Sequence, residues 1–129
     1  MDFSLTEEQK HLKITVKKFA EKELVDYAKD IEKNNTPPPT EVIKKFHELG
    51  ILGVNLPKSY GGLGLSHLDA VIVLEEIAKI SSAIAFPVFE SSFGPALAIA
   101  NFGTDEMCNK ILPKVCSGDM MVAISMSEP

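Results

Sequence analysis

Apolar side chains recur at steps of three or four residues through the first part of the chain, the spacing of one face of an α-helix. The stripe follows Thr6 and Gln9, which have the spacing of a capping box. Its members are Leu12, Val16, Phe19, Leu24, Tyr27 and Ile31. The pattern predicts one long amphipathic helix that ends near residues 34–35, before a connector (residues 36–39) that three prolines make incompatible with a helix.

Two shorter helices and a glycine-rich loop are predicted next. Thr40 has the chemistry to cap a helix that ends at Gly50, and Ser66 with Asp69 forms a second capping box. The intervening residues 50–66 contain five glycines and one proline, but apolar residues between the glycines predict an ordered loop. The loop lacks the lysine and the glycine spacing of a phosphate-binding loop, which excludes that kind of site.

Residues 83–100 are apolar on nearly every side, and Glu90 carries the single charge among them. This composition predicts a central buried helix, with a kink or a break at Pro87 and at Pro95 because each removes a backbone donor. We expect the run to be too short and too interrupted to span a bilayer. Thr104 then starts a fifth helix.

Residues 117–119 form a polar turn, and the alternation in residues 121–126 predicts the start of a β-strand. The predicted fold class is therefore all-α: an up-and-down bundle of about five helices, with a long glycine-rich loop and the start of a β-strand at the C-terminus. A strand without a sheet is unstable, so we expect its partners to lie outside the chain.

Composition narrows the function classes. The chain has 129 residues and 45% hydrophobic content, enough for one domain with its own core. A net charge of −5 and the absence of a basic cluster argue against nucleic acid or an anionic membrane as the main partner. The acidic N-terminus matches neither a signal peptide nor an arginine-rich transit peptide, so a cytoplasmic location is expected.

The metal-binding residue types are too scattered to form a site. Cys108 and Cys116 are eight residues apart without a CxxC pattern, which predicts two reduced thiols. The histidines, His11, His47 and His67, lack the spacing of ligand pairs. We therefore predict no metal.

Several short segments, in order and at matching separations, resemble the acyl-CoA dehydrogenase family of flavoenzymes. They include Leu-Thr-Glu-Glu-Gln, Gly-Gly-Leu-Gly, Glu-Glu-Ile-Ala and a final Ser-Glu-Pro; the matching positions are residues 5–9, 48–50, 61–64, 75–78, 101–104 and 127–129. No single segment is specific, but the ordered set is. The resemblance covers the whole chain and about the first third of a family member.

The resemblance implies two domain parts: an N-terminal helical domain (residues 1–119) and the start of a middle β-domain (residues 120–129). It also implies an FAD enzyme that oxidises an acyl-CoA thioester to trans-2-enoyl-CoA and passes electrons to an electron-transfer flavoprotein. In the family a glutamate removes the α proton, but it lies outside the matched part, so no catalytic residue is expected in this chain. Family members are commonly homotetramers.

Three groups of site residues follow from the resemblance. The positions that match flavin contacts are Ile124, Met126 and Ser127. The positions that match the acyl pocket are Ala85, Phe86, Phe89 and Glu90. The positions that match a pocket for the electron-transfer flavoprotein are Leu12, Ile51, Leu63 and Val73. For the apolar positions in each group, ordinary packing of a strand or core is the alternative explanation.

Details of these positions shape the expected substrate. Ser127 stands where threonine is more usual and keeps its hydroxyl, whereas Ile124 stands where many members carry an aromatic ring. Phe86 and Phe89 would crowd the pocket floor, which favours short, branched or cyclic acyl groups. Two other functions stay open: an oxygen-using relative (an acyl-CoA oxidase or a flavin monooxygenase-like enzyme) and a stand-alone helical interaction module.

Overall fold

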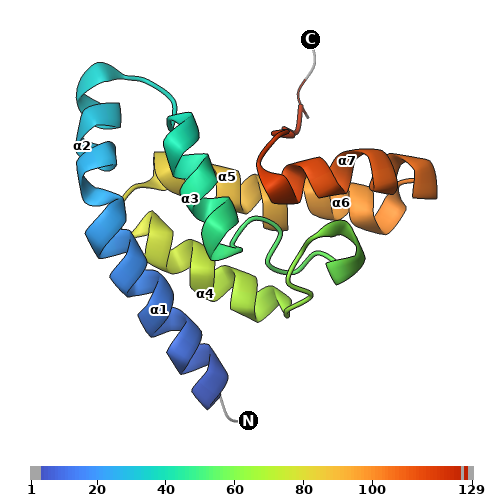
Figure 1. Cartoon of the computed structure of the whole chain (residues 1–129), viewed down its shortest axis with the longest axis horizontal. Helices are drawn as coiled ribbons and strands as arrows, with labels where there is room; N and C mark the ends of the chain where they lie inside the picture. Colours follow the sequence, from blue (N-terminus) through green and yellow to red (C-terminus); the bar gives the residue numbers. More distant parts are fainter. Residues whose placement is uncertain (1–3, 126, 128–129) are drawn as a thin grey trace.

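A computed structural model describes residues 4–125 and Ser127, and Figure 1 shows that this part of the chain is built from helices. It contains no strand, which confirms the all-α prediction for the described residues. The elements are α1 (Glu7–Glu23), α2 (Val25–Asn34), α3 (Thr40–Leu49), the 3-10 helix η1 (Lys58–Tyr60), α4 (His67–Ala78), α5 (Ser82–Ser92), α6 (Pro95–Phe102) and α7 (Asp105–Ser117).

The single long helix predicted for the first part of the chain is instead two helices, α1 and α2, that meet at Leu24. Leu24 has φ −111° and ψ −18°, away from ideal helical values, although its N–H still donates to Ala20 O. Its side chain is fully buried and faces the core. The apolar stripe continues through the break, so periodicity alone could not reveal it.

Capping predictions were mostly confirmed. Thr6 and Ser66 each form a complete capping box, and the Thr104 side chain accepts a hydrogen bond from Met107 N at the start of α7. The prediction for Thr40 was wrong: Thr40 is the first residue of α3, and Pro39 before it makes no side-chain cap bond.

The apolar run forms two helices, α5 and α6, which are separated at Phe93 and Gly94, directly before Pro95, where a kink or a break was predicted. Pro95 occupies the first turn of α6, where a missing N–H costs nothing, whereas α5 continues through Pro87 without ending. By length and composition alone Ser82–Phe102 is apolar enough to cross a membrane, a test that the buried core helix of a soluble protein also passes. In this fold the stretch is two helices, and the side chains Ile84, Val88 and Ala96 are buried.

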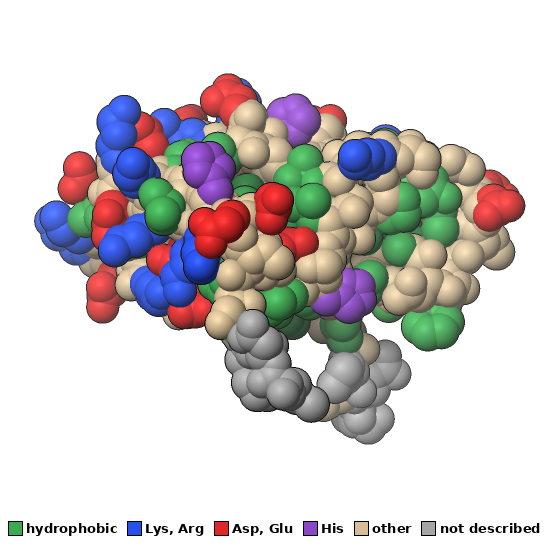
Figure 2. All heavy atoms as spheres, turned by 90° about the horizontal axis from the view of Figure 1, so that it is seen from below, with side chains coloured by type: hydrophobic (Ala, Val, Ile, Leu, Met, Phe, Trp, Pro, Cys, Tyr) green, Lys and Arg blue, Asp and Glu red, His purple; other side chains and the backbone are tan. Residues whose placement is uncertain are grey.

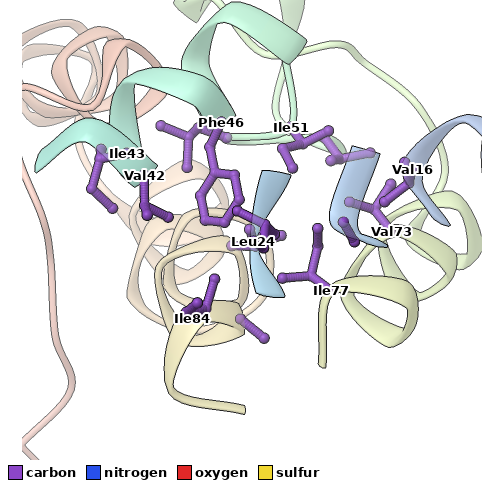
Figure 3. Packing of buried hydrophobic residues seen from close by; sticks show 14 of the residues in the cluster. Val16, Leu24, Val42, Ile43, Phe46, Ile51, Val73, Ile77 and Ile84 are labelled. Atoms are coloured by element: carbon purple, nitrogen blue, oxygen red, sulfur yellow. The ribbon is translucent and has the colours of Figure 1, made fainter. Parts of the chain in front are cut away.

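The core sits between α1, α3, α4 and α5. Helix α1 packs on α4 and α4 packs on α5, so segments from both halves of the sequence meet. Figure 3 shows Phe46 of α3 beside Leu24, and both side chains are fully buried. A second cluster around Leu56 and Leu112 joins α6 and α7 to the loop.

The glycine-rich loop (residues 50–66) is ordered, as predicted. The N–H of Leu63 donates to Gly53 O at 3.2 Å, which folds the loop back on itself. A Cβ added at Gly62 would lie 2.7 Å from Gly53 O, so only glycine allows this close backbone approach.

The predicted C-terminal strand is absent from residues 120–125 and Ser127, which have no regular structure. Met120 N donates to Lys114 O and thereby attaches the segment to the end of α7. The described residues offer no neighbouring strand, and an extended segment needs one to complete its hydrogen bonds.

Candidate functional site

One side of α5 presents a row of aromatic rings. Phe86, Phe89 and Phe93 are spaced so that they share one face of the helix, and neighbouring ring centroids are 5.8 Å and 6.2 Å apart. Phe86 is 58% exposed and Phe89 is 38% exposed. Two exposed phenylalanines in contact form an apolar surface that suits an apolar ligand or a covering segment.

The C-terminal segment lies next to this aromatic face at Gly94. A Cβ built on Gly94 would be 3.4 Å from Phe89 Cε1 and 3.7 Å from Ile124 Cδ1. Phe89 and Ile124 therefore flank the same open position, and Ile124 is itself half exposed. The structure brings together two residues that were assigned on separate grounds to the acyl pocket and to the flavin.

Glu90 lies at the edge of the aromatic face and also lines a small cavity. The cavity has a volume of about 10 Å³, close to the space that one water molecule needs. It lies between α5, α7 and the C-terminal segment; its lining residues are Ile43, Leu52, Pro87, Glu90, Ser91, Val115, Gly118, Met120, Met121 and Val122. Partial burial raises the pKa of the Glu90 carboxyl, because removing water disfavours the charged form.

Of the residues predicted for these sites, Ala85 lies away from the exposed face of α5. Ala85 points into the core and is 3% exposed, so it does not belong to the exposed face of α5. The structure describes Ser127 as exposed, but Met126 lies outside the described residues. Phe86, Phe89 and Glu90 thus form the substrate-side group, and Ile124 is the predicted flavin contact that meets it.

The four residues predicted for partner docking do not all reach the surface. Ile51 is 2% exposed and Val73 is 0% exposed, and both belong to the main core. Leu12 and Leu63 are partly exposed and pack against that core. The accessible part of the predicted docking pocket is therefore limited to Leu12 and Leu63.

Sequence reasoning missed other exposed apolar residues. Leu68 and Val71 lie on α4, and Leu65 lies just before that helix. All three side chains are exposed. In the view of Figure 2, charged side chains gather on the left half of the molecule. Hydrophobic side chains with fewer charges lie on the right half, the side on which Figure 1 shows α6 and α7.

The cysteines are free and buried, and burial raises the pKa of the Cys116 thiol to about 11. Among residues 4–125 and 127, no group of three or more histidine, cysteine, aspartate or glutamate side chains could hold a metal ion. The aromatic face of α5 thus offers an apolar wall with the half-buried carboxyl group of Glu90 at its edge.

Comparisons with known proteins give a consistent result. The family model described as "Acyl-CoA dehydrogenase, N-terminal domain" matches residues 6–119. The mitochondrial isovaleryl-CoA dehydrogenase of Bos taurus is 38% identical over 126 residues, which are 97% of this chain and 30% of that protein.

Two solved structures share the fold. The acyl-CoA dehydrogenase from Geobacillus kaustophilus is 31% identical with a TM-score of 0.89, over 100% of this chain and 33% of the other. The acyl-CoA dehydrogenase from Bacillus anthracis, solved in complex with FAD, is 25% identical with a TM-score of 0.86, over 98% of this chain and 21% of the other. This chain therefore spans a third or less of the length of these three proteins.

Proposed function

This chain belongs to the acyl-CoA dehydrogenase family, whose N-terminal domain it forms, and from this membership we propose that it works within an FAD-dependent acyl-CoA dehydrogenase. The proposed reaction oxidises an acyl-CoA thioester to a trans-2-enoyl-CoA. The α carbon loses a proton and the β carbon loses a hydride. This chain is proposed to supply binding surfaces, and the base that takes the proton is proposed to come from outside it.

The exposed aromatic face of α5 is the observation that carries the role proposed for this chain within that enzyme, a binding surface for the acyl group. Phe86 and Phe89 offer apolar surface to an acyl chain, and Ile124 adjoins them at Gly94. Burying an acyl chain against such rings contributes about 0.8 kcal/mol for each methylene removed from water. We propose that Phe86, Phe89 and Glu90 form one wall of the acyl pocket.

The C-terminal segment has side chains that fit a flavin edge. Ile124 is exposed beside Phe89, and an apolar side chain there can pack on a flat ring. Ser127 is exposed, and its hydroxyl can donate a hydrogen bond to a ring nitrogen or oxygen. When bound, FAD accepts the hydride from the substrate. These two residues, with Met126, are the proposed flavin contacts.

Short, branched or cyclic acyl groups are the proposed substrates. The rings of Phe86 and Phe89 lie 5.8 Å apart, and two rings at the floor of an acyl pocket would leave less room for a long straight chain. Each methylene that a filled pocket rejects lowers transition-state binding by about 1–3 kcal/mol.

An electron-transfer flavoprotein is the proposed electron acceptor, and Leu12 and Leu63 are its proposed contacts. Both are apolar, partly exposed and anchored on the core, which suits a firm docking surface. Three further properties remain predictions: a boundary between a helical domain (residues 1–119) and a β-domain from residue 120, a homotetramer, and a cytoplasmic location. The Bos taurus relative is described as mitochondrial.

A chimeric flavoenzyme tests the proposal. It joins this chain to the remaining two thirds of the Geobacillus kaustophilus acyl-CoA dehydrogenase, of which the chain covers 33%. Without oxygen, a short or branched acyl-CoA should reduce the bound flavin and remove its visible absorbance. A chimera that retains FAD but is not reduced by any acyl-CoA would contradict the proposal. Oxygen consumption in air would instead identify an oxidase.

A further inference from the structure

Two adjacent serines of α5, Ser91 and Ser92, are buried at 3% and 0% exposure. Serine is a poorer helix former than alanine, and burying an unpaired hydroxyl costs free energy. Their place inside the fold therefore needs a reason beyond filling space.

Each serine accepts a hydrogen bond from the glycine-rich loop. Gly53 N–H donates to Ser91 Oγ at 3.2 Å, and Val54 N–H donates to Ser92 Oγ at 3.3 Å. Ser91 Oγ in turn donates to Val88 O at 3.1 Å, which orients its hydroxyl. Consecutive helix residues thus bind consecutive loop amides.

Two bonds of this kind restrict the helix more than one bond does. Successive side chains of an α-helix point about 100° apart around its axis. Ser91 and Ser92 therefore hold the helix at two different angles, and α5 cannot rotate about its axis without breaking at least one bond. Two bonds oppose such a rotation more strongly than either bond alone.

The loop that supplies these amides is itself fixed. Gly53 O accepts from Leu63 N at 3.2 Å, and Val54 O accepts from Leu65 N at 3.0 Å. Both loop residues are buried, so their N–H groups have no access to water as an alternative partner. The serines connect α5 to a rigid part of the fold.

Rotation of α5 would move its aromatic face. Phe86 precedes Ser91 by five residues, which places it roughly 140° away around the helix axis. A rotation of α5 about its axis carries Phe86 and Phe89 around together with the two serines, and so moves both rings relative to Ile124. The position of the aromatic face thus depends on the bonds that Ser91 and Ser92 make to the loop.

We propose that Ser91 and Ser92 are positioning residues that set the depth of the acyl pocket, and so its selectivity, without touching the ligand. This inference rests on the proposed function of the α5 face. It extends that function to two residues on the buried side of the helix, which act through Phe86 and Phe89.

The first test measures the 129-residue chain itself by NMR, with Ser91→Ala, Ser92→Ala and the double variant. Losing a bond should speed amide exchange at Gly53 or Val54 by about tenfold. The ring resonances of Phe86 and Phe89, and the cross-peaks of the Phe89 ring to the Ile124 methyl, should change as well. Ser81→Ala is the matched control, because it removes the Ile84 N–H bond at the other end of α5 without touching the loop.

Ring signals that stay unchanged in all three variants while the loop amides exchange faster would overturn the inference. The single variants keep one bond each, so they decide the matter if the double variant does not fold. This readout needs neither FAD nor substrate, and it stands even if the proposed enzymatic function fails.

The second test uses the chimeric flavoenzyme. The serine variants should change the ratio of kcat/KM for a long straight acyl-CoA to that for a short one by about tenfold, while Ser81→Ala keeps the wild-type ratio. If the wild-type chimera oxidises no acyl-CoA, the proposed function fails. The NMR result still shows whether Ser91 and Ser92 position the aromatic rings. If the rings move but the ratio stays constant, the selectivity role is refuted.

Discussion

The side-chain amide of Gln9 donates a hydrogen bond to a carboxylate oxygen of Asp69 across 3.1 Å. Gln9 and Asp69 each occupy the third position of their helix and complete its capping box with Thr6 and Ser66 respectively. One bond therefore joins the first turns of α1 and α4, two helices that are sixty residues apart in the sequence and packed together.

This link should be visible as thermodynamic coupling. Gln9→Ala and Asp69→Ala should each lower the free energy of unfolding by about 1 kcal/mol, because each also removes a capping interaction. The double variant should lose less than the sum, by at least about 0.5 kcal/mol. Urea unfolding of the four proteins measures this difference. Strictly additive losses would show that the two capping boxes act independently.

Asp69 should also contribute to the pH dependence of stability. Burial, the largest influence, would raise its pKa, but hydrogen bonds from the Ser66 hydroxyl, the Ser66 backbone and Gln9 together lower the pKa below the ordinary value of 3.8. A lowered pKa in the folded state stabilises the protein above the unfolded-state pKa. This stabilisation is lost as the pH falls through the folded-state value.

Urea unfolding between about pH 5 and pH 2 tests whether stability falls with decreasing pH in this way. The wild type should lose stability in this range more steeply than Asp69→Asn, which has no proton to bind at this site. The remaining acidic groups titrate in both proteins and serve as the internal control. If the free energy of unfolding changed equally with pH in the two proteins, Asp69 would make no contribution to the pH dependence of stability.

Helix boundaries could be predicted from the sequence wherever a particular type of residue has a single, local structural effect. The capping boxes at Thr6 and Ser66 are examples, because a short polar side chain there satisfies the free N–H groups of the first turn. The break at Leu24 has no such signal. An aliphatic residue in a continuous apolar stripe fits one helix or two, and only packing against other elements decides.

The candidate site was harder to predict for a related reason. Residues 83–100 are apolar on almost all sides, so the sequence does not say which face of α5 looks outward. The structure turns Ala85 inward and Phe86 outward, and it places Ser91 and Ser92 against the loop. Ile51 and Val73 were misplaced in the same way, because burial depends on neighbours distant in the sequence.

Leu63→Ser in the chimeric flavoenzyme tests the docking proposal. Turnover with an electron-transfer flavoprotein should fall by about tenfold, the effect of losing a contact worth about 1.4 kcal/mol. Activity with a small dye acceptor should stay near wild type. Phe102→Ser, a similar change at an exposed residue on α6, is the control and should leave both activities unchanged. If both activities of Leu63→Ser fall together with the Tm, Leu63 is a core residue.

The 129-residue chain alone should bind FAD weakly or not at all. Only Ile124 to Ser127 are proposed to meet the flavin, and these few contacts must offset the lost translational and rotational freedom of the ligand. Gel filtration of the purified chain mixed with FAD should separate a colourless protein from the yellow cofactor, whereas the chimeric flavoenzyme should retain it. A stoichiometric yellow complex of the chain would show a far more complete flavin site.

The acyl selectivity of the chimeric flavoenzyme tests most directly whether the α5 face lines the acyl pocket. The measurement is kcat/KM for straight acyl-CoA substrates from four to sixteen carbons, and for branched ones, in the wild type and in Phe89→Ala. The wild type should prefer short or branched groups, and Phe89→Ala should gain about tenfold toward longer chains because the removed ring leaves room. A wild-type value that rises steadily with chain length, or a profile that Phe89→Ala leaves unchanged, would contradict this account.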